Sequence, residues 1–489
     1  MLQQSVLSKG IAMNMQLERI TQLAILFTVS CFGIVANTNA DMGKEGSHEV
    51  LELAEDIGRW LVGNAIQNDN GTVWPDNALS PDTIGYDLAS GVAGKVVYFV
   101  ALYRATGNVE YLKMAEGGAD YLIGVLQDPS SFEQNPRRAS LYTGISGIGV
   151  ALLHVQRHAS DQKYGRAVKQ IVNQLGEWSV EDGGGLRWSD EFNDLIYGDA
   201  GTALFLSYVA QQTADEEALD LAMQGARFLL GQAQKSATGS FWYFRRSKPF
   251  NLPNFSHGTA GIAYVLATVG TFADDESLRS GAREGFTYIR SISEIEGGLL
   301  RIPYGWGADS WAGLYEFGWA HGLSGTASFF ARMQMSGIDA EAAAKYENLT
   351  RHTILNINLP ATPAAPFAEP STALDKRFGR AGVLSLLSQR SVNEPVSEDV
   401  VRLRDSIFAH IQSAAIRENR TAHWVVDAPE FMGGGRAAYT GIFHGAAGIG
   451  LAVLRLHSSI NGASPYDTLP DDPFAWPEET KNDVGVKEN

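Results

Sequence analysis

The stretch Gly258-Thr-Ala-Gly261, which runs directly into apolar residues, is one of seven copies of a Gly-x-(Ala/Ser)-Gly motif. The other copies are Gly91–Gly94, Gly144–Gly147, Gly198–Gly201, Gly322–Gly325, Gly379–Gly382 and Gly445–Gly448. The first glycines of successive copies are 53, 54, 60, 64, 57 and 66 residues apart. A motif that recurs at such a period is typical of one supersecondary unit used repeatedly.

Each motif opens a run that is apolar almost all round, as expected of a helix surrounded by protein. Longer amphipathic segments lie between these runs, at 48–66, 108–126, 162–179, 215–233, 275–293, 338–357 and 397–416. Two alternating sets of seven helices predict an all-α ring of seven hairpins, with parallel inner helices shielded by outer ones. We expect the glycines to let the starts of the inner helices crowd together near the axis.

The connections within this ring are predicted to be unequal. The turn from an inner helix to the next outer helix is short, whereas the return connection is about 15 to 28 residues long. All the long connections must then lie on one face, where the inner helices begin, and long loops on a rigid scaffold often build sites. They contain most of the tryptophans, namely Trp74, Trp188, Trp242, Trp306, Trp311, Trp319 and Trp424.

The two ends of the chain differ from the repeats. Residues 1–40 resemble a secretory signal peptide, with Arg19 before an apolar run and small residues up to Ala40. We therefore expect an exported protein, periplasmic or secreted, with no stable membrane insertion once the signal is removed. Residues 41–460 form the ring, and 461–489 form a proline-rich acidic tail that we expect to be extended and to lie across it.

Charge and cysteine content exclude several classes of function. A formal net charge of −17 argues against nucleic acid as a partner. The only cysteine, Cys31, lies within the predicted signal peptide. The mature chain therefore has no thiol nucleophile and no thiolate metal ligand.

The residue before the first glycine of each motif is predicted to face the mouth of the ring. In chain order these residues are Ser90, Thr143, Tyr197, His257, His321, Phe378 and His444. Three of the ten histidines fall at this position, which predicts a site at the mouth. The nearby Asp194 is expected to stay ionised, because the helix N-termini favour anions, and a histidine beside it to shuttle protons.

Other residues are predicted to complete the site. We expect Tyr197, Asp199, Glu316 and Trp319 to line the cavity. Four arginines in the long connections have the chemistry to bind a carboxylate or phosphate: Arg245, Arg246, Arg301 and Arg436.

The sevenfold motif, the segment Ser256-His257-Gly258-Thr-Ala-Gly261 and His444-Gly445 resemble the lanthionine synthetase C-like family along the chain from about residue 48 to 459. The resemblance implies an α/α toroid of seven helical hairpins. In active members a zinc ion activates a peptide thiol, which adds to a dehydroalanine or dehydrobutyrine. It also implies that His257 is the acid/base histidine, Asp194 its aspartate and His444 a zinc ligand.

The resemblance fails at the two cysteine ligands. Ala320 and Phe443 stand where the family has cysteine, and Glu316 stands in place of an active-site arginine. An ordinary zinc-thiolate cyclase is therefore not expected, and no cofactor is firmly predicted. A zinc site rebuilt from His257, His321 and His444 remains an alternative.

Three functions stay open at this point. The first is peptide or thiol chemistry without the usual zinc, in which His257 and His321 act as acid and base and Asp194 orients one of them. The second is a carbohydrate-active enzyme, with tryptophans that stack on sugars and a carboxylate pair drawn from Asp194, Asp199, Asp309, Glu316 and Asp427. The third is a binding protein without catalysis. The expected partner is thus a peptide, a small molecule or an oligosaccharide.

Overall fold

The computed structural model describes residues 44–128, 130–306, 313–356, 374–389, 397–428 and 434–476. These residues are mostly helical and confirm the predicted α/α toroid. The predicted signal peptide and the tail beyond residue 476 lie outside them. None of the helices in the described ranges combines the length and the apolar character that a membrane span requires.

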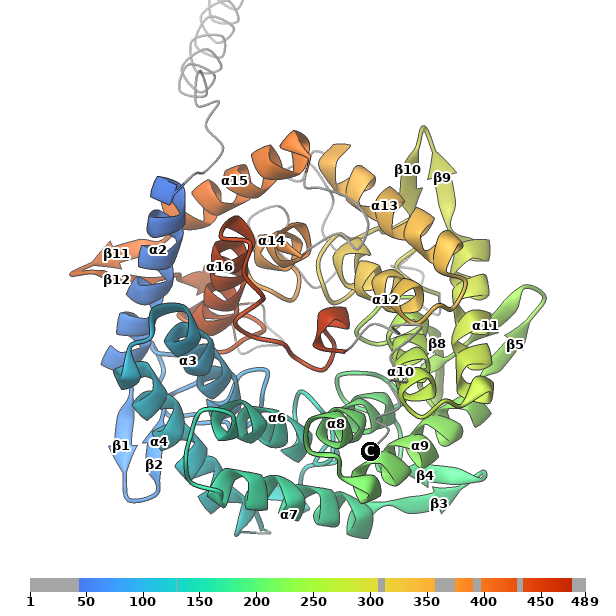
Figure 1. Ribbon diagram of the computed structural model, residues 1–489, viewed down its shortest axis with the longest axis horizontal. Coiled ribbons are helices and arrows are strands. Elements are labelled where there is room, and N and C mark those ends of the chain that lie inside the picture. Colours follow the sequence, from blue (N-terminus) through green and yellow to red (C-terminus); the bar gives the residue numbers. More distant parts are fainter. Residues whose placement is uncertain are drawn as a thin grey trace, which may run out of the picture. The chain divides into compact units, whose positions relative to one another are not determined.

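Inner helices begin at the residue after the first glycine of each motif. They are α3 (Val92–Thr106), α6 (Ile145–Gln156), α8 (Asp199–Thr213), α10 (Thr259–Phe272), α12 (Leu323–Met335), α14 (Arg380–Ser388) and α16 (Ala446–Ile460). Each contacts the next, and α16 contacts α3, so the inner helices close into a ring (Figure 1).

Outer helices surround this ring. They are α2 (Lys44–Gly63), α4 (Val109–Leu126), α7 (Lys163–Trp178), α9 (Glu216–Gly231), α11 (Glu276–Ile292), α13 (Ala340–Asn356) and α15 (Glu398–Ser413). Six of them pack on the inner helix that precedes them in the chain, whereas α2 packs chiefly on α16. The first outer helix and the last inner helix therefore complete the seventh pair and close the ring without a covalent link.

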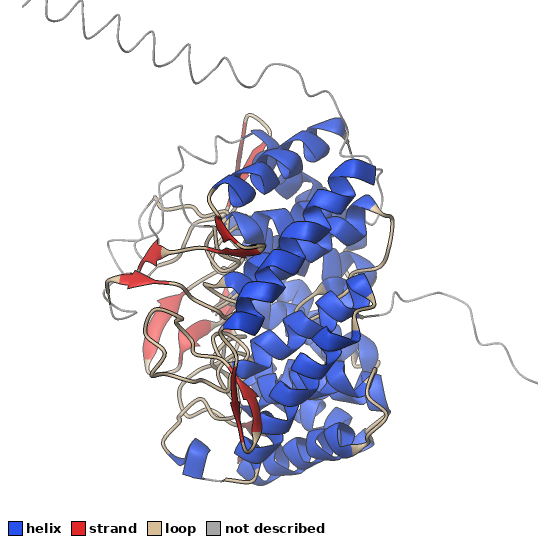
Figure 2. Cartoon of the chain, turned by 90° about the vertical axis from the view of Figure 1, so that its left-hand side faces the viewer, coloured by secondary structure: helices blue, strands red, loops and turns tan. Residues whose placement is uncertain are grey.

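The sequence suggested that the long connections are loops throughout, but most of them contain short strands. After five of the outer helices the chain forms a two-stranded hairpin: β1 (Ile66–Asn68) with β2 (Gly71–Val73), β3 (Val180–Asp182) with β4 (Gly185–Arg187), β5 (Gln234–Ser236) with β6 (Gly239–Phe241), β9 (Glu294–Glu296) with β10 (Leu299–Arg301), and β11 (Ile416–Glu418) with β12 (Thr421–His423). Two-residue turns join the strands, and left-handed Gly-Gly pairs such as Gly183-Gly184 favour such turns. The strands gather on one side of the helices (Figure 2).

Four tryptophans follow these hairpins and tie them to the outer helices. In each case the indole N–H donates to a carbonyl thirteen residues earlier, near the end of the outer helix: Trp74 to Leu61, Trp188 to Leu175, Trp242 to Leu229 and Trp424 to Ile411. This repeated bond satisfies a carbonyl that the helix end leaves unpaired. These four tryptophans therefore serve the scaffold and do not support the sugar-stacking hypothesis.

Replacing one of these tryptophans should destabilise the fold. Trp242 is fully buried, so Trp242→Phe leaves a carbonyl without its donor and a small void, at a cost of about 2–4 kcal/mol. Trp306→Phe is the matched control, because Trp306 is 42% exposed and its loss should change stability by less than about 0.5 kcal/mol. Urea unfolding followed by circular dichroism measures both, and equal effects would contradict the assigned role.

The second glycine of every motif is required by a close approach within its own repeat. A Cβ at this glycine would lie 1.8–2.6 Å from the carbonyl oxygen six residues earlier, for example 1.9 Å from that of Phe255 at Gly261. In several repeats the side chain of the neighbouring repeat also comes close, such as Leu88 at Gly147. The crowding is thus between each helix start and the loop that leads into it, as well as between adjacent repeats.

A circle of main-chain hydrogen bonds joins the repeats just before the inner helices. The donor in each repeat lies two residues before the first glycine, or three in the third repeat, and its bond to the next repeat measures 2.9–3.4 Å. The bonds run from Ala89 to Tyr142, Tyr142 to Ile196, Leu195 to Ser256, Ser256 to Ala320, Ala320 to Arg377, Arg377 to Phe443 and Phe443 back to Ala89. We call this circle the belt. It fixes the backbone beside the residues that the sequence assigns to the mouth.

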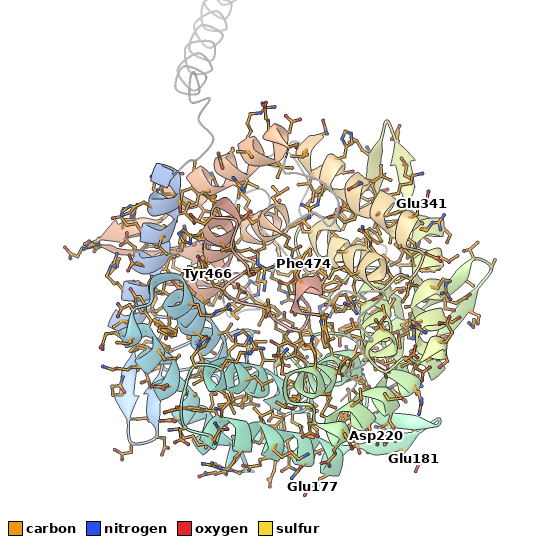
Figure 3. The ribbon with its side chains drawn as sticks, in the orientation of Figure 1. Glu177, Glu181, Asp220, Glu341, Tyr466 and Phe474 are labelled. Atoms are coloured by element: carbon orange, nitrogen blue, oxygen red, sulfur yellow. The ribbon has the colours of Figure 1, made fainter. Side chains whose placement is uncertain are left out.

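The described part of the tail lies inside the inner ring. Phe474 lies within this ring and Tyr466 lies where α16 and α3 meet, whereas Glu177 and Glu341 lie on the outer helices α7 and α13 (Figure 3). Side chains of the inner helices hold tail carbonyls, as Tyr264 does with Pro470 at 3.1 Å, and the Tyr142 hydroxyl donates to Asp471 at 2.9 Å. The tail therefore fills the space behind the belt, and the site faces the side of the hairpins.

Candidate active site

The residues before the first glycines bring five rings together along the mouth. In chain order they are Tyr197, His257, His321, Phe378 and His444, and consecutive ring centroids lie 5.3, 5.3, 5.4 and 5.7 Å apart. Each ring follows a belt residue or its neighbour, so its backbone is held from both sides. The repeat therefore builds a continuous arc of side chains in repeats three to seven.

His257 forms a buried pair with Asp194 at this arc. The imidazole Nδ1 lies 2.7 Å from the Asp194 Oδ2, and Asp194 also accepts the main-chain N–H groups of Ile196 and Tyr197. The main-chain N–H of His257 donates to Asn254 at 2.9 Å. These bonds fix the ring. Its other nitrogen, Nε2, accepts from Arg377 at 3.4 Å and is the atom that can exchange a proton with a substrate.

Burial dominates the protonation of this pair. It raises the pKa of Asp194 to about 8, in the direction opposite to the expectation that this aspartate stays ionised. The two main-chain N–H bonds and Arg137 act in the opposite direction but do not offset the loss of water. Burial, Arg377 and Arg137 lower the pKa of His257. The pair therefore titrates as a unit, and its protons are not assigned to one residue alone.

A second histidine stands beside the first. The His321 Nδ1 lies 3.1 Å from the Tyr304 hydroxyl and 3.6 Å from Glu316 Oε2. Both carboxyl oxygens of Glu316 are buried without a hydrogen-bond partner in the described residues, and burial raises the pKa of this carboxyl to about 8. Burial, His257 and Arg377 lower the pKa of His321.

The raised pKa of Glu316 predicts how stability depends on pH. As pH rises above the usual value of 4.5, the unfolded chain loses this proton before the folded chain does, so Glu316 destabilises the fold progressively up to about pH 8. Glu316→Gln cannot ionise. Its free energy of unfolding should therefore rise relative to that of the wild type by up to about 1.4 kcal/mol per pH unit in this range. Urea unfolding at pH 5 and pH 8 measures the difference, and a difference independent of pH would contradict the buried carboxyl.

Sequence reasoning missed two arginines that flank the first pair. The Arg377 Nη2 lies 3.4 Å from His257 Nε2, and the Arg137 guanidinium lies 3.9 Å from the centroid of the Tyr197 ring. A signal for Arg377 was present, because it is the only charged residue two positions before a first glycine. Three of the four arginines named from the sequence are engaged elsewhere: Arg245 with Glu191 at 2.7 Å, Arg246 with Asp199 at 2.9 Å and Arg301 with Glu296 at 3.1 Å. The fourth, Arg436, is exposed in β14 (Arg436–Ala437).

Two of the residues expected to line the cavity have other roles. Asp199 is wholly buried, accepts the main-chain N–H groups of Trp188 and Ser189, and pairs with Arg246, so it anchors a loop. Trp319 packs against Tyr142 and Phe443 in an aromatic layer behind the arc. It lines a cavity of about 40 Å³ beside the tail, together with Leu469 and Asp471, and not the space at the histidines. Tyr197 and Glu316 do lie beside the histidines. Asp427 is exposed in β13 (Val426–Asp427), and Asp309 and Trp311 lie outside the described residues.

The residues present do not fit a zinc-thiolate centre. Phe443 stacks on Tyr142 at 4.6 Å and Ala320 carries no ligand atom, while the only cysteine of the chain is Cys31. His444 Nδ1 lies 3.1 Å from Asp375 Oδ2, and Phe378 stands between His444 and His321. The three histidines therefore do not converge, and the described residues contain no group of three or more ligands suited to a metal.

The fold and the arc together define a helical toroid with a buried histidine–aspartate pair at its mouth. The family of lanthionine synthetase C-like proteins matches residues 82–335, and the chain belongs to this family. This confirms the resemblance seen in the sequence. A search of curated proteins finds no match.

Three solved structures resemble this chain, and the first of them shows the same fold. A nisin cyclase is 15% identical, with 88% of this chain and 98% of that chain covered and a TM-score of 0.57. An α-1,6-mannanase of Salegentibacter sp. HEL1_6 is 14% identical over 74% of this chain and 98% of that chain, with a TM-score of 0.41. A D-mannose isomerase is 12% identical over 77% of this chain and 100% of that chain, with a TM-score of 0.45. At these identities the likeness to the nisin cyclase concerns the fold alone.

Proposed function

We propose that this protein is an enzyme that transfers protons at the carbon next to a carbonyl group, and that it adds thiols to dehydroamino acid residues without a zinc-thiolate centre. The observation that carries the proposal is the 2.7 Å bond between His257 and Asp194 in a buried site with a second histidine beside it. A positioned imidazole with a buried carboxyl behind it is suited to general acid–base catalysis. Membership of the family supports the same chemistry.

The proposed step uses both histidines. The thiol proton moves to Nε2 of His321, the sulfur forms a bond to Cβ, and the electrons of the C=C bond move toward the carbonyl as an enolate. Arg377 can only donate to Nε2 of His257, so this nitrogen starts without a proton. The proton passes from His321 through water to Nε2 of His257, which delivers it to Cα and leaves both imidazoles neutral. One S–H and one C=C bond are consumed, and one C–S and one C–H bond are formed, so the step balances.

A cavity that shares Glu316 with the site supports a substrate of some size. A cavity of about 230 Å³ is lined by Glu316 and by apolar side chains that include Leu300, Phe317 and Leu323. Such a space fits an apolar group of a substrate.

The test is the addition of 2-mercaptoethanol to N-acetyl-dehydroalanine and to its N-methylamide. We expect the wild type to accelerate at least one of these reactions, and His257→Ala to lower the rate about 10²–10⁴-fold. His48→Ala is the matched control, because His48 is an exposed histidine on α2. No acceleration of either reaction, or an equal loss in both variants, would overturn the proposal.

We also propose that the chain is exported through residues 1–40. The support is the apolar run that ends in small residues before Asp41. Mass spectrometry of the protein recovered from the periplasm or the medium should find Asp41 at the N-terminus. A full-length chain retained in the cell would contradict this part of the proposal.

A further inference from the structure

Arg377 presents a charged group to the site without an acidic partner. Its Nη2 faces His257 Nε2 at 3.4 Å, and its Nε is buried with no hydrogen-bond partner in the described residues. The main chain of Arg377 is fixed by the belt on both sides. Arg245 also has a buried Nε without a hydrogen-bond partner, but it pairs with Glu191 through Nη2, whereas Arg377 makes no ion pair among the described residues.

Two carboxyl groups near Arg377 are bonded to other residues, and a third, Glu316, makes no ion pair with it. Asp375 accepts the main-chain N–H groups of Phe378 and Gly379 and contacts His444. Asp194 is bonded to His257. Glu316 lies beside His321 and makes no ion pair with Arg377 among the described residues. The positive charge of Arg377 is therefore available to a ligand.

Arg137 adds a second positive charge near the His257–Asp194 pair, on the side of Tyr197. Its guanidinium lies over the rings of Tyr197 and Phe192, and it has no ion pair with a carboxylate in the described part of the chain. By contrast, the loop arginines Arg245 and Arg246 are both paired. Two arginines without acidic partners thus flank His257 in a chain whose formal net charge is −17.

We propose that Arg377, assisted by Arg137, forms a carboxylate-binding site next to Nε2 of His257, so that the substrate carries a free carboxylate at its reacting end. The planar guanidinium fork matches a carboxylate and binds it with two hydrogen bonds. A carboxylate held there lies beside the atom that exchanges the proton, which is where a carbon next to that carboxylate must lie. The substrate is then the C-terminal residue of a peptide, an N-acyl amino acid, or a sugar acid, and not an internal peptide residue. This inference rests on the proposed function for the identity of the reacting carbon, but binding is measured independently of turnover.

Binding of simple carboxylates tests the site. Calorimetric titration of the full-length protein compares N-acetyl-dehydroalanine with its neutral N-methylamide, and D-galacturonate with D-galactose. We expect at least one acid to bind and its neutral counterpart to bind about tenfold more weakly or not at all. The two acids distinguish an amino-acid substrate from a sugar acid. Binding of neither acid at millimolar concentration, or equal binding of each acid and its neutral counterpart, would overturn the inference.

Variants separate the charge from the shape of the site. Arg377→Met should weaken binding of the acid about tenfold or more, and Arg377→Lys should weaken it less, because it keeps the charge but loses the fork. Arg138→Gln is the matched control, since Arg138 lies over Trp178 and makes no contact with His257. Unchanged binding in Arg377→Met would overturn the inference. If Arg377→Met does not fold, the comparison of Arg377→Lys with Arg138→Gln decides the question.

His257→Ala distinguishes this inference from the proposed function. It should still bind the acid although it no longer catalyses the addition. If the wild type binds the acid but shows no turnover, the proposed function is overturned and the carboxylate site is supported. Turnover of the N-methylamide as fast as that of the acid would remove the carboxylate site and keep the proposed function.

Discussion

Replacing the second glycine of the last motif is expected to prevent the ring from closing. A Cβ at Gly448 would lie 1.8 Å from the carbonyl oxygen of Ile442, a backbone atom that cannot move aside without breaking the belt next to it. We expect Gly448→Ala to destabilise the protein by about 4 kcal/mol or more. Urea unfolding followed by circular dichroism gives the change in the free energy of unfolding.

The control for this substitution is Gly63→Ala. Gly63 ends α2, and a Cβ there would meet no atom within 4 Å. The same change should then leave stability within about 1 kcal/mol of the wild type, since alanine also restricts the unfolded chain. A Gly448→Ala variant as stable as Gly63→Ala would show that the close approach is not required by the fold.

Asp194→Asn is expected to lower the rate of thiol addition about 10²–10⁴-fold while the protein stays folded. Asparagine keeps the shape of the aspartate, and its carbonyl oxygen can still accept the N–H of Tyr197, whereas its amide nitrogen replaces the oxygen that accepts the N–H of Ile196. It removes the carboxyl that exchanges a proton with Nδ1 of His257, so the acid/base character of Nε2 is lost. Steady-state rates and thermal unfolding are measured on the same preparation.

Asp199→Asn is the matched control for this effect on the rate. Asp199 is as deeply buried as Asp194, but it pairs with Arg246 and does not touch His257. Its substitution should reduce stability more than it reduces the rate. An equal loss of rate in both variants would assign the effect of Asp194→Asn to general damage to the fold.

The scaffold could be predicted from the sequence because it rests on local signals that repeat. The glycine motifs mark the starts of the inner helices, and a predicted outer segment such as 215–233 corresponds to α9 at Glu216–Gly231. The hairpins between them were missed, since strands of three residues carry too little periodicity to stand out. Their turns, such as Gly183-Gly184 and Gly297-Gly298, were the available signal.

The composition of the site was harder to predict because it depends on contacts between repeats. The residue before each glycine identified His257 and His321, since register alone brings these positions together. The position of Asp199 one residue inside its motif directs it to Arg246 and the loop at Trp188, which the sequence does not reveal. Arg377 joins the site from the sixth repeat. Its contact with His257 of the fourth repeat forms only when the belt is closed.

The protonation of Asp194 could not be predicted from its position at the helix starts. The electrostatic argument from helix N-termini favoured an ionised carboxyl, yet complete burial raises its pKa to about 8. Desolvation depends on how many side chains cover the group, and Phe244 and Tyr197, which cover the neighbouring imidazole, come from separate segments. Only the assembled structure contains that information.

The stereochemistry of the addition tests the central role of His257 most directly. Addition of 2-mercaptoethanol to N-acetyl-dehydroalanine creates a new stereocentre at Cα, where the last proton arrives. Chiral chromatography of the product should show a single enantiomer with the wild type, because Nε2 of the fixed His257 ring delivers the proton to one face only, and a racemic product with His257→Ala. A racemic product from the wild type, formed at the uncatalysed rate, would contradict the assignment of His257 as the acid of this site.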